Sequence, residues 1–378
     1  MFEIAIYADT DDERVAYVTL PANKNMIVDA MDRERIFGRT STHITECRDF
    51  PELLDVEFDE PPTLDELNFL AKRLEEISAD TSEKYAYRAL LKKPMETVNE
   101  AINRTYNLQT IPVYPCTGYA EYGEIVLDND LLEELRDIPD EVFALLDAAK
   151  VGRAMAEREG GVFIDGYYAV ADSYDPALVY DEQLPEPPED WLFRLEVAGI
   201  PEKDEDVYKM KTETLMLPAD EDLMQDIAEA LGEKRIEDCV YFKFESAIPQ
   251  ITAEHLDSME NINTLNDIAQ KYSELSRENA AKFKAVLERE NKFGLEKAWR
   301  VLNLLDSFEF DNSVNSYAEF GEQYLVKHLP PDFDRTLLQS VHATDMARKI
   351  LDKTSGALTE YGAVSSSGGR LYTMVEAP

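Results

Sequence analysis

The sequence predicts an α+β protein built by tandem duplication of one module, in which small antiparallel sheets surround a helical middle. The duplication is predicted by a hexapeptide that occurs twice, as YAEYGE at Tyr119–Glu124 and as YAEFGE at Tyr317–Glu322, an offset of 317 − 119 = 198 residues. Other blocks recur in the same order, among them ELNFLA at Glu66–Ala71 and TLNDIA at Thr264–Ala269. Such order indicates two copies of one structural unit. The mixed class is predicted because strand-like and helix-like patterns alternate within each copy.

The first copy is predicted to open with a hairpin and a helix. Phe2–Ala8 and Arg14–Leu20 are rich in β-branched and aromatic residues, and the turn-prone DTDDE separates them. Apolar residues then recur at helical spacing from Asn23 to Ile36, and Asn23 can cap that helix. A third strand is predicted at His43–Cys47. It is followed by a folded acidic loop from Asp49 to Glu60, whose carboxylates face water.

A helical middle follows this loop. Thr63 and Glu66 form a capping box ahead of an apolar stripe, which predicts a helix that starts at Thr63. Shorter helices are predicted at Tyr85–Leu91 and Met95–Ile102. The two prolines of Ile111–Pro115 fix φ and remove donors, so this segment is predicted to be an extended connector.

The central acidic element is a helix predicted from Tyr119 to Leu135. At 100° per residue its aromatic and aliphatic residues gather on one face and its carboxylates lie nearly opposite. The aromatic residues of both hexapeptides are therefore interpreted as core residues: Tyr119, Tyr122, Tyr317 and Phe320. A helix at Asp147–Met155 and a hairpin at Val162–Ala171, turned at Asp165-Gly166, complete the copy.

The second copy repeats this plan after a linker rich in proline and acids. Strands are predicted at Leu192–Val197, Thr214–Leu217 and Cys239–Glu245, with a helix at Glu221–Leu231 and further helices from Asn263 onward. The predicted boundaries are 1–180 for copy 1, 181–190 for the linker and 191–378 for copy 2. Within copy 1 the β/α, helical and α+β parts are 1–62, 63–110 and 111–180, and within copy 2 they are 191–260, 261–310 and 311–378.

One segment of copy 2 is locally basic. The run from Arg277 to Arg300 holds seven Lys and Arg residues with few acids to offset them. It is either a solvated helix face or a surface that docks against the acids of copy 1.

Composition and charge restrict the classes of partner and the compartment that the protein can have. The 378 residues are 44 % hydrophobic, which is enough to build cores, and 78 acids against 38 bases give a net charge of −40. This charge repels nucleic acids and anionic membranes and attracts proteins whose own ligand is a polyanion. The three cysteines follow no disulfide or zinc pattern, and neither an export signal nor a membrane span is predicted. We therefore expect a cytoplasmic protein.

Motifs of catalysis are not found in the sequence. Its four histidines stand in unrelated contexts, and it contains no HExxH, GxSxG or glycine-rich phosphate loop. Asp128-Asn129-Asp130 begins like a calcium loop but lacks the glycine and the final glutamate of that loop. We expect no metal, no cofactor and no enzymatic activity.

The charge itself is then the strongest functional signal. B-DNA carries one negative charge per ~1.7 Å of axis, so a charge of −40 corresponds to roughly 70 Å of duplex. Two rows of carboxylates on helices would approximate the phosphate density. Ordinary solvated acids and the general acidity of proteins from salt-loving organisms are the alternative explanations.

Both copies resemble the ArdA family of antirestriction proteins, which mobile genetic elements and phages use against type I restriction-modification enzymes. The resemblance rests on ordered blocks in each half and covers most of the chain. In copy 1 the blocks are TLDELNFLAKRLEEI (Thr63–Ile77), YAEYGE, IPDEV (Ile138–Val142), VGRAM (Val151–Met155) and GGVFIDGYY (Gly160–Tyr168). In copy 2 they are LPADEDLMQDIAEAL (Leu217–Leu231), SAIPQI (Ser246–Ile251), NINTLNDIA (Asn261–Ala269), NSYAEFGEQYL (Asn315–Leu325) and LTEYG (Leu358–Gly362).

The resemblance implies an elongated α+β protein of small subdomains that acts as a DNA mimic. Such a protein occupies the DNA-binding groove of the restriction enzyme's methyltransferase core in a bacterial cytoplasm, and none of its residues is catalytic. The acidic antirestriction segment of the family matches Glu121–Glu141 and Glu319–Asp334. The chain departs from the family in its two joined modules, in the insertion between Pro330 and Arg348, and in Ala347 where copy 1 has Gly152.

Charge and resemblance together give the candidate phosphate-mimicking residues. In copy 1 they are Asp55, Glu57, Asp59, Glu60, Glu121, Glu124, Asp128, Asp130, Glu133, Glu134, Asp137, Asp140 and Glu141. In copy 2 they are Asp220, Glu221, Asp222, Asp226, Glu319, Glu322, Asp332 and Asp334. The copies are expected to form a pseudo-dimer within one chain, with a further homodimer as the alternative.

Two other functions fit the same sequence. The target could be another DNA-handling defence complex, such as a CRISPR effector. The protein could also be an acidic structural or assembly protein of a phage, in which the repeats serve interaction.

Overall fold

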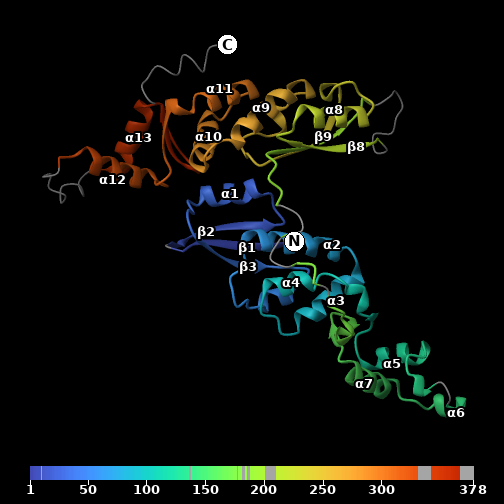
Figure 1. The fold of residues 1–378 in the computed structure, drawn as a ribbon. Helices are drawn as coiled ribbons and strands as arrows, with labels where there is room; N and C mark the ends of the chain where they lie inside the picture. The colour runs from blue at the N-terminus through green and yellow to red at the C-terminus, as the bar shows by residue number, and fades with distance from the viewer. Residues whose placement is uncertain are drawn as a thin grey trace. The chain divides into compact units, whose positions relative to one another are not determined.

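The computed structural model describes residues 1–9, 11–135, 138–176, 178–180, 184, 188–200, 210–330 and 342–366. Across these residues the fold is α+β, with thirteen α-helices and four three-stranded antiparallel sheets (Figure 1). The chain divides into two compact units. Unit 1 comprises Met1–Asp9, Tyr17–Ala22 and Thr40–Pro188, and unit 2 comprises Thr10–Ala16, Asn23–Arg39 and Glu189–Pro378.

Unit 1 holds two of the sheets and six helices in its described residues. Strand β2 begins among the residues of unit 2 and ends in unit 1. The elements are β1 (Phe2–Ala8), β2 (Asp11–Leu20), β3 (Thr40–Glu46), α2 (Leu64–Ser78), α3 (Thr81–Leu91), α4 (Val98–Asn103), β4 (Val113–Pro115), α5 (Tyr119–Asp128), α6 (Asp140–Phe143), α7 (Ala148–Glu159), β5 (Val162–Ile164) and β6 (Tyr167–Ala169).

Local sequence signals explain where several of these elements begin. The predicted capping box at the start of α2 is confirmed: the Thr63 side chain accepts from the N–H of Glu66, and the Glu66 carboxylate accepts from the N–H of Thr63. The hairpin of β5 and β6 turns at Asp165 and Gly166, both at positive φ, as the Asp-Gly pair predicts. The first sheet has the order β2-β1-β3, so the predicted hairpin and third strand are also confirmed.

A small subdomain of unit 1 joins the sheet β4-β6-β5 to helices α5 and α7, which pack against each other. Its core consists of Cys116, Tyr122, Val126, Ala156, Tyr168 and Val170. The ring of Tyr122 lies 4.1 Å from that of Tyr168 and 5.5 Å from that of Tyr114, centroid to centroid. Aromatic rings therefore fill the space between α5 and the sheet.

Unit 2 holds the other two sheets and, from the N-terminal part of the chain, helix α1. Its elements are α1 (Lys24–Arg33), β7 (Phe193–Ala198), β8 (Thr212–Leu217), α8 (Glu221–Ala230), β9 (Val240–Ser246), α9 (Ile262–Ser273), α10 (Arg277–Glu290), α11 (Leu295–Asn303), β10 (Phe308–Asp311), α12 (Tyr317–His328), α13 (Ala343–Lys353), β11 (Ala357–Thr359) and β12 (Gly362–Ser366).

The predicted duplication is visible in the topology. The sheets β2-β1-β3 and β8-β7-β9 have the same strand order, and so do β4-β6-β5 and β10-β12-β11. Single contacts repeat as well. The side chain of Asn68 accepts from the N–H of Ala22 and donates to its carbonyl, and Asn266 makes the same two hydrogen bonds with Ala219.

The contacts between paired helices repeat in the same way. The guanidinium of Arg153 lies 5.2 Å from the ring centroid of Tyr119, and that of Arg348 lies 5.2 Å from that of Tyr317. These matches fix the equivalence of α5 with α12 and of α7 with α13.

One predicted element is wrong in length. The acidic helix was expected to run from Tyr119 to Leu135, but α5 ends at Asp128 and Glu133–Leu135 is a separate 3-10 turn. Asn129 caps α5, and Asp130 adopts a left-handed φ of 50°, which a continuing α-helix does not allow. The acidic residues therefore follow a helix and then a turn.

Candidate partner-binding surfaces

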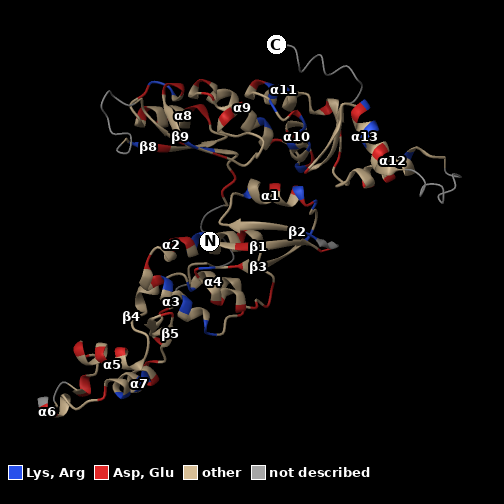
Figure 2. Cartoon of the chain, turned by 180° about the vertical axis from the view of Figure 1, so that it is seen from behind, with Lys and Arg blue, Asp and Glu red and all other residues tan. Residues whose placement is uncertain are grey.

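Helix α5 presents its carboxylates away from the core of unit 1. Tyr122 and Val126 are fully buried, whereas Glu121, Glu124 and Asp128 are exposed. The helical period explains this division, because residues 121, 124 and 128 share one face. Figure 2 shows the acidic residues in red along α5. Glu124 and Asp128 form no ion pair with any described residue, so their charges are open to a partner.

Two carboxylates of this segment are held in place. The Glu121 carboxylate accepts from the N–H and the hydroxyl of Thr117 at 2.6 and 2.9 Å, and these hydrogen bonds lower the pKa of Glu121. The pKa of Glu134 is also lowered, by a backbone hydrogen bond and by Arg158, whose guanidinium lies 2.7 Å away. Both groups are therefore ionised at neutral pH.

The acidic surface continues beyond the end of α5. Asp130, Glu133, Glu134 and Glu141 are all exposed. Asp137 lies outside the described residues, and of Asp140 the structure describes the backbone alone. We call the exposed carboxylates of Glu121, Glu124, Asp128, Asp130, Glu133, Glu134 and Glu141 the α5 acidic surface.

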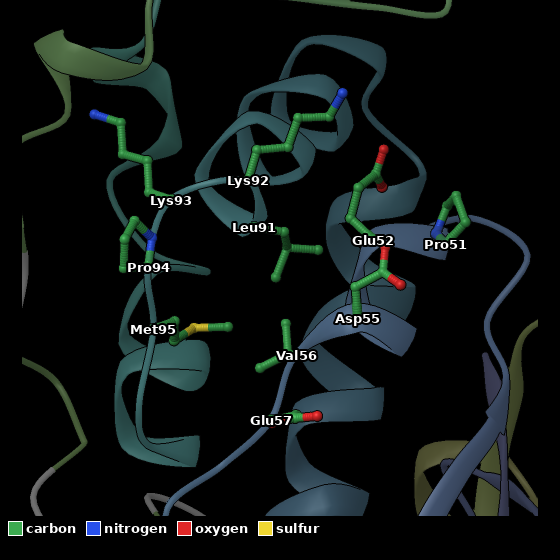
Figure 3. Close-up of a pocket in the computed structure, with 10 residues that line it drawn as sticks. All are labelled: Pro51, Glu52, Asp55, Val56, Glu57, Leu91, Lys92, Lys93, Pro94 and Met95. Atoms are coloured by element: carbon green, nitrogen blue, oxygen red, sulfur yellow. The ribbon is translucent and has the colours of Figure 1, made fainter.

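A second group of candidate acids in unit 1 surrounds a hollow. Asp55, Glu57, Asp59 and Glu60 are exposed, and Asp55 and Glu57 line a pocket of about 680 Å³. In Figure 3, Pro51, Glu52 and Asp55 form one side of this pocket and Lys93, Pro94 and Met95 the other. Glu52 is already paired with the buried Arg88 at 2.7 Å. The nearby lysines make this group less strongly anionic than the α5 acidic surface.

Unit 2 contributes two smaller groups. Asp220, Glu221, Asp222 and Asp226 are exposed at the start of α8, where Asp220 caps the helix by accepting from the N–H of Leu223. On α12, Glu322 is exposed, whereas Glu319 is half-buried and its carboxylate accepts from the N–H of Asn315 at 2.8 Å. The remaining predicted residues, Asp332 and Asp334, lie outside the described part of the chain. The α12 group is thus the counterpart of the α5 acidic surface.

The aromatic residues of the repeated hexapeptide differ in burial. Tyr122 is a core residue, as predicted, and its hydroxyl donates to Glu159 at 2.5 Å. Burial and this carboxylate raise the pKa of Tyr122. Tyr119 is 38 % exposed, and Tyr317 and Phe320 are half-buried. The prediction of core aromatics is confirmed for Tyr122 and is wrong for Tyr119, whose ring meets that of Phe163 edge to face and contacts the guanidinium of Arg153 at the surface.

The basic run of copy 2 docks against acids of the N-terminal helix. Lys284 is 1 % exposed, and its ammonium lies 2.7 Å from Asp29 and 3.4 Å from Asp32. Arg277 pairs with Asp32 at 2.7 Å, and the hydroxyl of Tyr361 donates to Asp29 at 2.8 Å. For these two bases the docking interpretation is confirmed.

Sequence reasoning missed some residues of this constellation. Asp29 and Asp32 appeared to be ordinary residues of an amphipathic helix, although both are buried. Glu157 on α7 is an exposed acid of the same subdomain as α5 and was not singled out. The locally basic run of copy 2 gave a hint of the first pair, since a basic helix that docks within the protein needs acidic partners.

Among the described residues, no three His, Cys, Asp or Glu side chains are grouped so that they could hold a metal ion. No helix in the described ranges is long and apolar enough to cross a membrane. Neither a scan against protein-family models nor a search of curated proteins returns a match for this chain.

Proposed function

We propose that this protein is a non-enzymatic antirestriction inhibitor of the kind that its resemblance to the ArdA family implies. Its exposed carboxylates take the places of DNA phosphates in the basic DNA-binding groove of a type I restriction-modification enzyme. The enzyme is then blocked because DNA and the inhibitor compete for one groove. The inhibitor itself performs no chemistry and requires no cofactor.

The observation that supports this proposal most is the exposure of the candidate acids. Of the candidates whose side chains the structure describes, all but the half-buried Glu319 are exposed to solvent. Asp29 and Asp32, which serve the fold, differ from these acids because they are both buried and paired with bases. These exposed carboxylates are thus a part of the net charge of −40 that a partner can reach.

The spacing on α5 also supports the proposal. Glu121, Glu124 and Asp128 follow each other by three and four residues, which corresponds to about 4.5 and 6 Å along the helix axis. Phosphates on one DNA strand advance by about 3.4 Å along the duplex axis. The charges on one helix face are therefore spaced more widely than the phosphates of one DNA strand. The turn at Glu133 and Glu134 adds further charges to the same segment.

The test replaces charges without changing side-chain size. A variant with amides at Glu121, Glu124, Asp128, Glu133 and Glu134 should lose inhibition of DNA cleavage by a type I enzyme. The matched control carries amides at five exposed acids elsewhere: Asp65, Glu75, Glu96, Glu254 and Asp257. Equal loss of inhibition in both variants would show that total charge alone matters. Full inhibition by the first variant would contradict the proposal.

The assay also separates the alternative targets. Inhibition of another DNA-handling complex with the type I enzyme unaffected would move the proposal to that complex. Association with phage particles without inhibition of any nuclease would instead favour a structural role.

A further inference from the structure

The space beneath α12 differs from the equivalent space beneath α5. In unit 2 a cavity of about 740 Å³ lies between α12, α13 and the sheet β10-β12-β11. In unit 1 the same space is filled by the rings of Tyr114, Tyr122 and Tyr168. The two copies thus share a backbone plan and differ in what occupies this position.

The strand registers identify which residues make the difference. Tyr114 lies opposite Tyr168 in unit 1, and Asp311 lies opposite Ala363 at the equivalent place in unit 2. Tyr122 is replaced by Phe320, and Glu159 by Thr354. Two aromatic rings are therefore missing in unit 2, and a carboxylate stands where one of them would be. All four of these unit 2 residues line the cavity.

The walls of the cavity offer two kinds of contact. Along α12, the ring of Tyr324 stacks on that of His328 with centroids 3.9 Å apart and 16° between the planes, and Phe320 continues this aromatic face. On β10, the carboxylates of Glu309 and Asp311 are exposed and form no ion pair with a described residue. The Asp311 carboxylate is oriented by the N–H and hydroxyl of Ser313, at 2.9 and 2.6 Å.

A planar cation can contact the aromatic face of α12 and the carboxylates of β10 at the same time. Guanidinium groups stack on aromatic faces and pair with carboxylates, whereas an ammonium lacks the flat surface. Lys327 also lines the cavity and its charge opposes a cation, but two carboxylates outnumber it. We propose that this cavity binds an arginine side chain of the basic partner protein. The identity of that partner rests on the proposed function, whereas the preference for arginine rests on the cavity.

The test uses N-acetyl-arginine amide as the probe and the full-length protein labelled at Ile, Leu and Val methyl groups. The probe should shift the signals of Ile350, Leu351 and Val364, which line the cavity, in a saturable manner. The uncharged isostere N-acetyl-citrulline amide should bind about 5-fold more weakly, because both the cation–π and the ionic contact are lost. Equal binding of the two compounds would overturn the proposal.

Three variants localise the site. Ala363→Tyr introduces the ring that unit 1 carries at this position and should abolish the methyl shifts. Asp311→Asn should weaken binding, and Lys327→Gln should strengthen it, each by a few-fold as single exposed charges do. Unchanged methyl signals of Leu287 and Val301 in the core of unit 2 control for folding of the unit that carries the substitutions. Undiminished arginine binding by a folded Ala363→Tyr variant would place the site elsewhere and contradict the proposal.

The outcome can be separated from that of the proposed function, because the probe experiment needs no restriction enzyme. Arginine binding by a protein that inhibits no DNA-handling enzyme would leave the cavity assignment intact and remove the proposed partner. Inhibition without any arginine binding would remove the cavity assignment and leave the proposed function intact.

Discussion

Lys284 joins α10 to α1 through a buried cluster of charges. Its ammonium contacts Asp29 and Asp32 and lies 4.9 Å from the ring centroid of Tyr361, while Arg33 adds a second base 2.9 Å from Asp29. A buried ionic cluster is stable only when every charge keeps its partner. The side chain at 284 is thus decisive for the packing of α1 within unit 2.

Replacing Lys284 by Met should destabilise unit 2 by about 3–5 kcal/mol, because Asp29 and Asp32 would lose the buried cation that they share and keep only the more exposed Arg33 and Arg277. Urea unfolding followed by circular dichroism measures this loss. The exposed Lys292 lies just beyond the same helix, and Lys292→Met should change the free energy of unfolding by less than about 0.5 kcal/mol. Equal stability of the two variants would show that the buried cluster contributes little.

Glu121 gives a prediction about pH. Its hydrogen bonds to Thr117 lower its pKa in the folded protein relative to an ordinary glutamate, whose pKa is about 4.3. The charged form is favoured by folding, so this stabilisation is present above the unfolded pKa and is lost as pH falls through the folded pKa. The stability difference between wild type and Glu121→Gln should therefore be largest at neutral pH and shrink in acid.

Thermal unfolding of both proteins across pH 3–7 checks this prediction. Glu124→Gln is the matched control, because Glu124 lies on the same helix face and is exposed without a hydrogen bond to a described residue. A Glu121→Gln effect that did not change with pH would contradict the assignment of the hydrogen bonds.

At the scale of elements, the contact between α5 and α7 depends on two glycines that bring the helices together. A Cβ at Gly123 would lie 1.7 Å from the carbonyl oxygen of Ala148, and a Cβ at Gly152 would lie 2.0 Å from that of Tyr119. Gly321 repeats the first contact against Ala343, at 2.2 Å. At the second position copy 2 carries Ala347, which accommodates a Cβ where copy 1 does not.

Gly123→Ala should separate α5 from α7 and destabilise this subdomain by about 1–3 kcal/mol or more, as overpacked contacts do. The same variant should inhibit less, since the α5 acidic surface would no longer be held on a fixed helix. Gly118→Ala is the control, because a Cβ there meets no atom within 4 Å and the backbone is extended. The unfolding curves of the two variants measure this difference in stability. Overlapping curves would contradict close packing at Gly123.

The elements themselves were largely predictable from sequence, and their contacts were not. Capping at Thr63 and the turn at Asp165-Gly166 depend on neighbouring residues, so local patterns predict them. The end of α5 was missed because the left-handed conformation of Asp130 has no strong sequence signal. The buried cluster joins residues 252 and 255 positions apart in the chain, and only a locally basic run hinted at it.

The candidate site was predictable to a similar degree. Exposure of the acids followed from helical spacing, as for Glu121 and Glu124 opposite Tyr122. The cavity beneath α12 was not foreseen, because it depends on side-chain size at positions that only the strand registers align, such as Tyr168 and Ala363.

At the scale of the whole molecule, the duplication predicts a particular oligomeric state. If the two copies form a pseudo-dimer within one chain, light scattering should give the mass of a single chain, 43.1 kDa. A mass twice as large would show that copies also pair between chains. The measurement should be made at moderate salt, because a charge of −40 causes strong repulsion between molecules at low ionic strength.

Displacement of DNA from a type I methyltransferase complex tests the central claim most directly. A fluorescent duplex bound to the purified complex is titrated with this protein at salt concentrations from 50 to 200 mM, and the DNA that remains bound is measured by anisotropy. Exposed carboxylates that replace phosphates should displace the duplex completely at low salt, and the affinity of the inhibitor should fall steeply as salt rises. A duplex that stays bound at excess inhibitor and low salt would contradict the account.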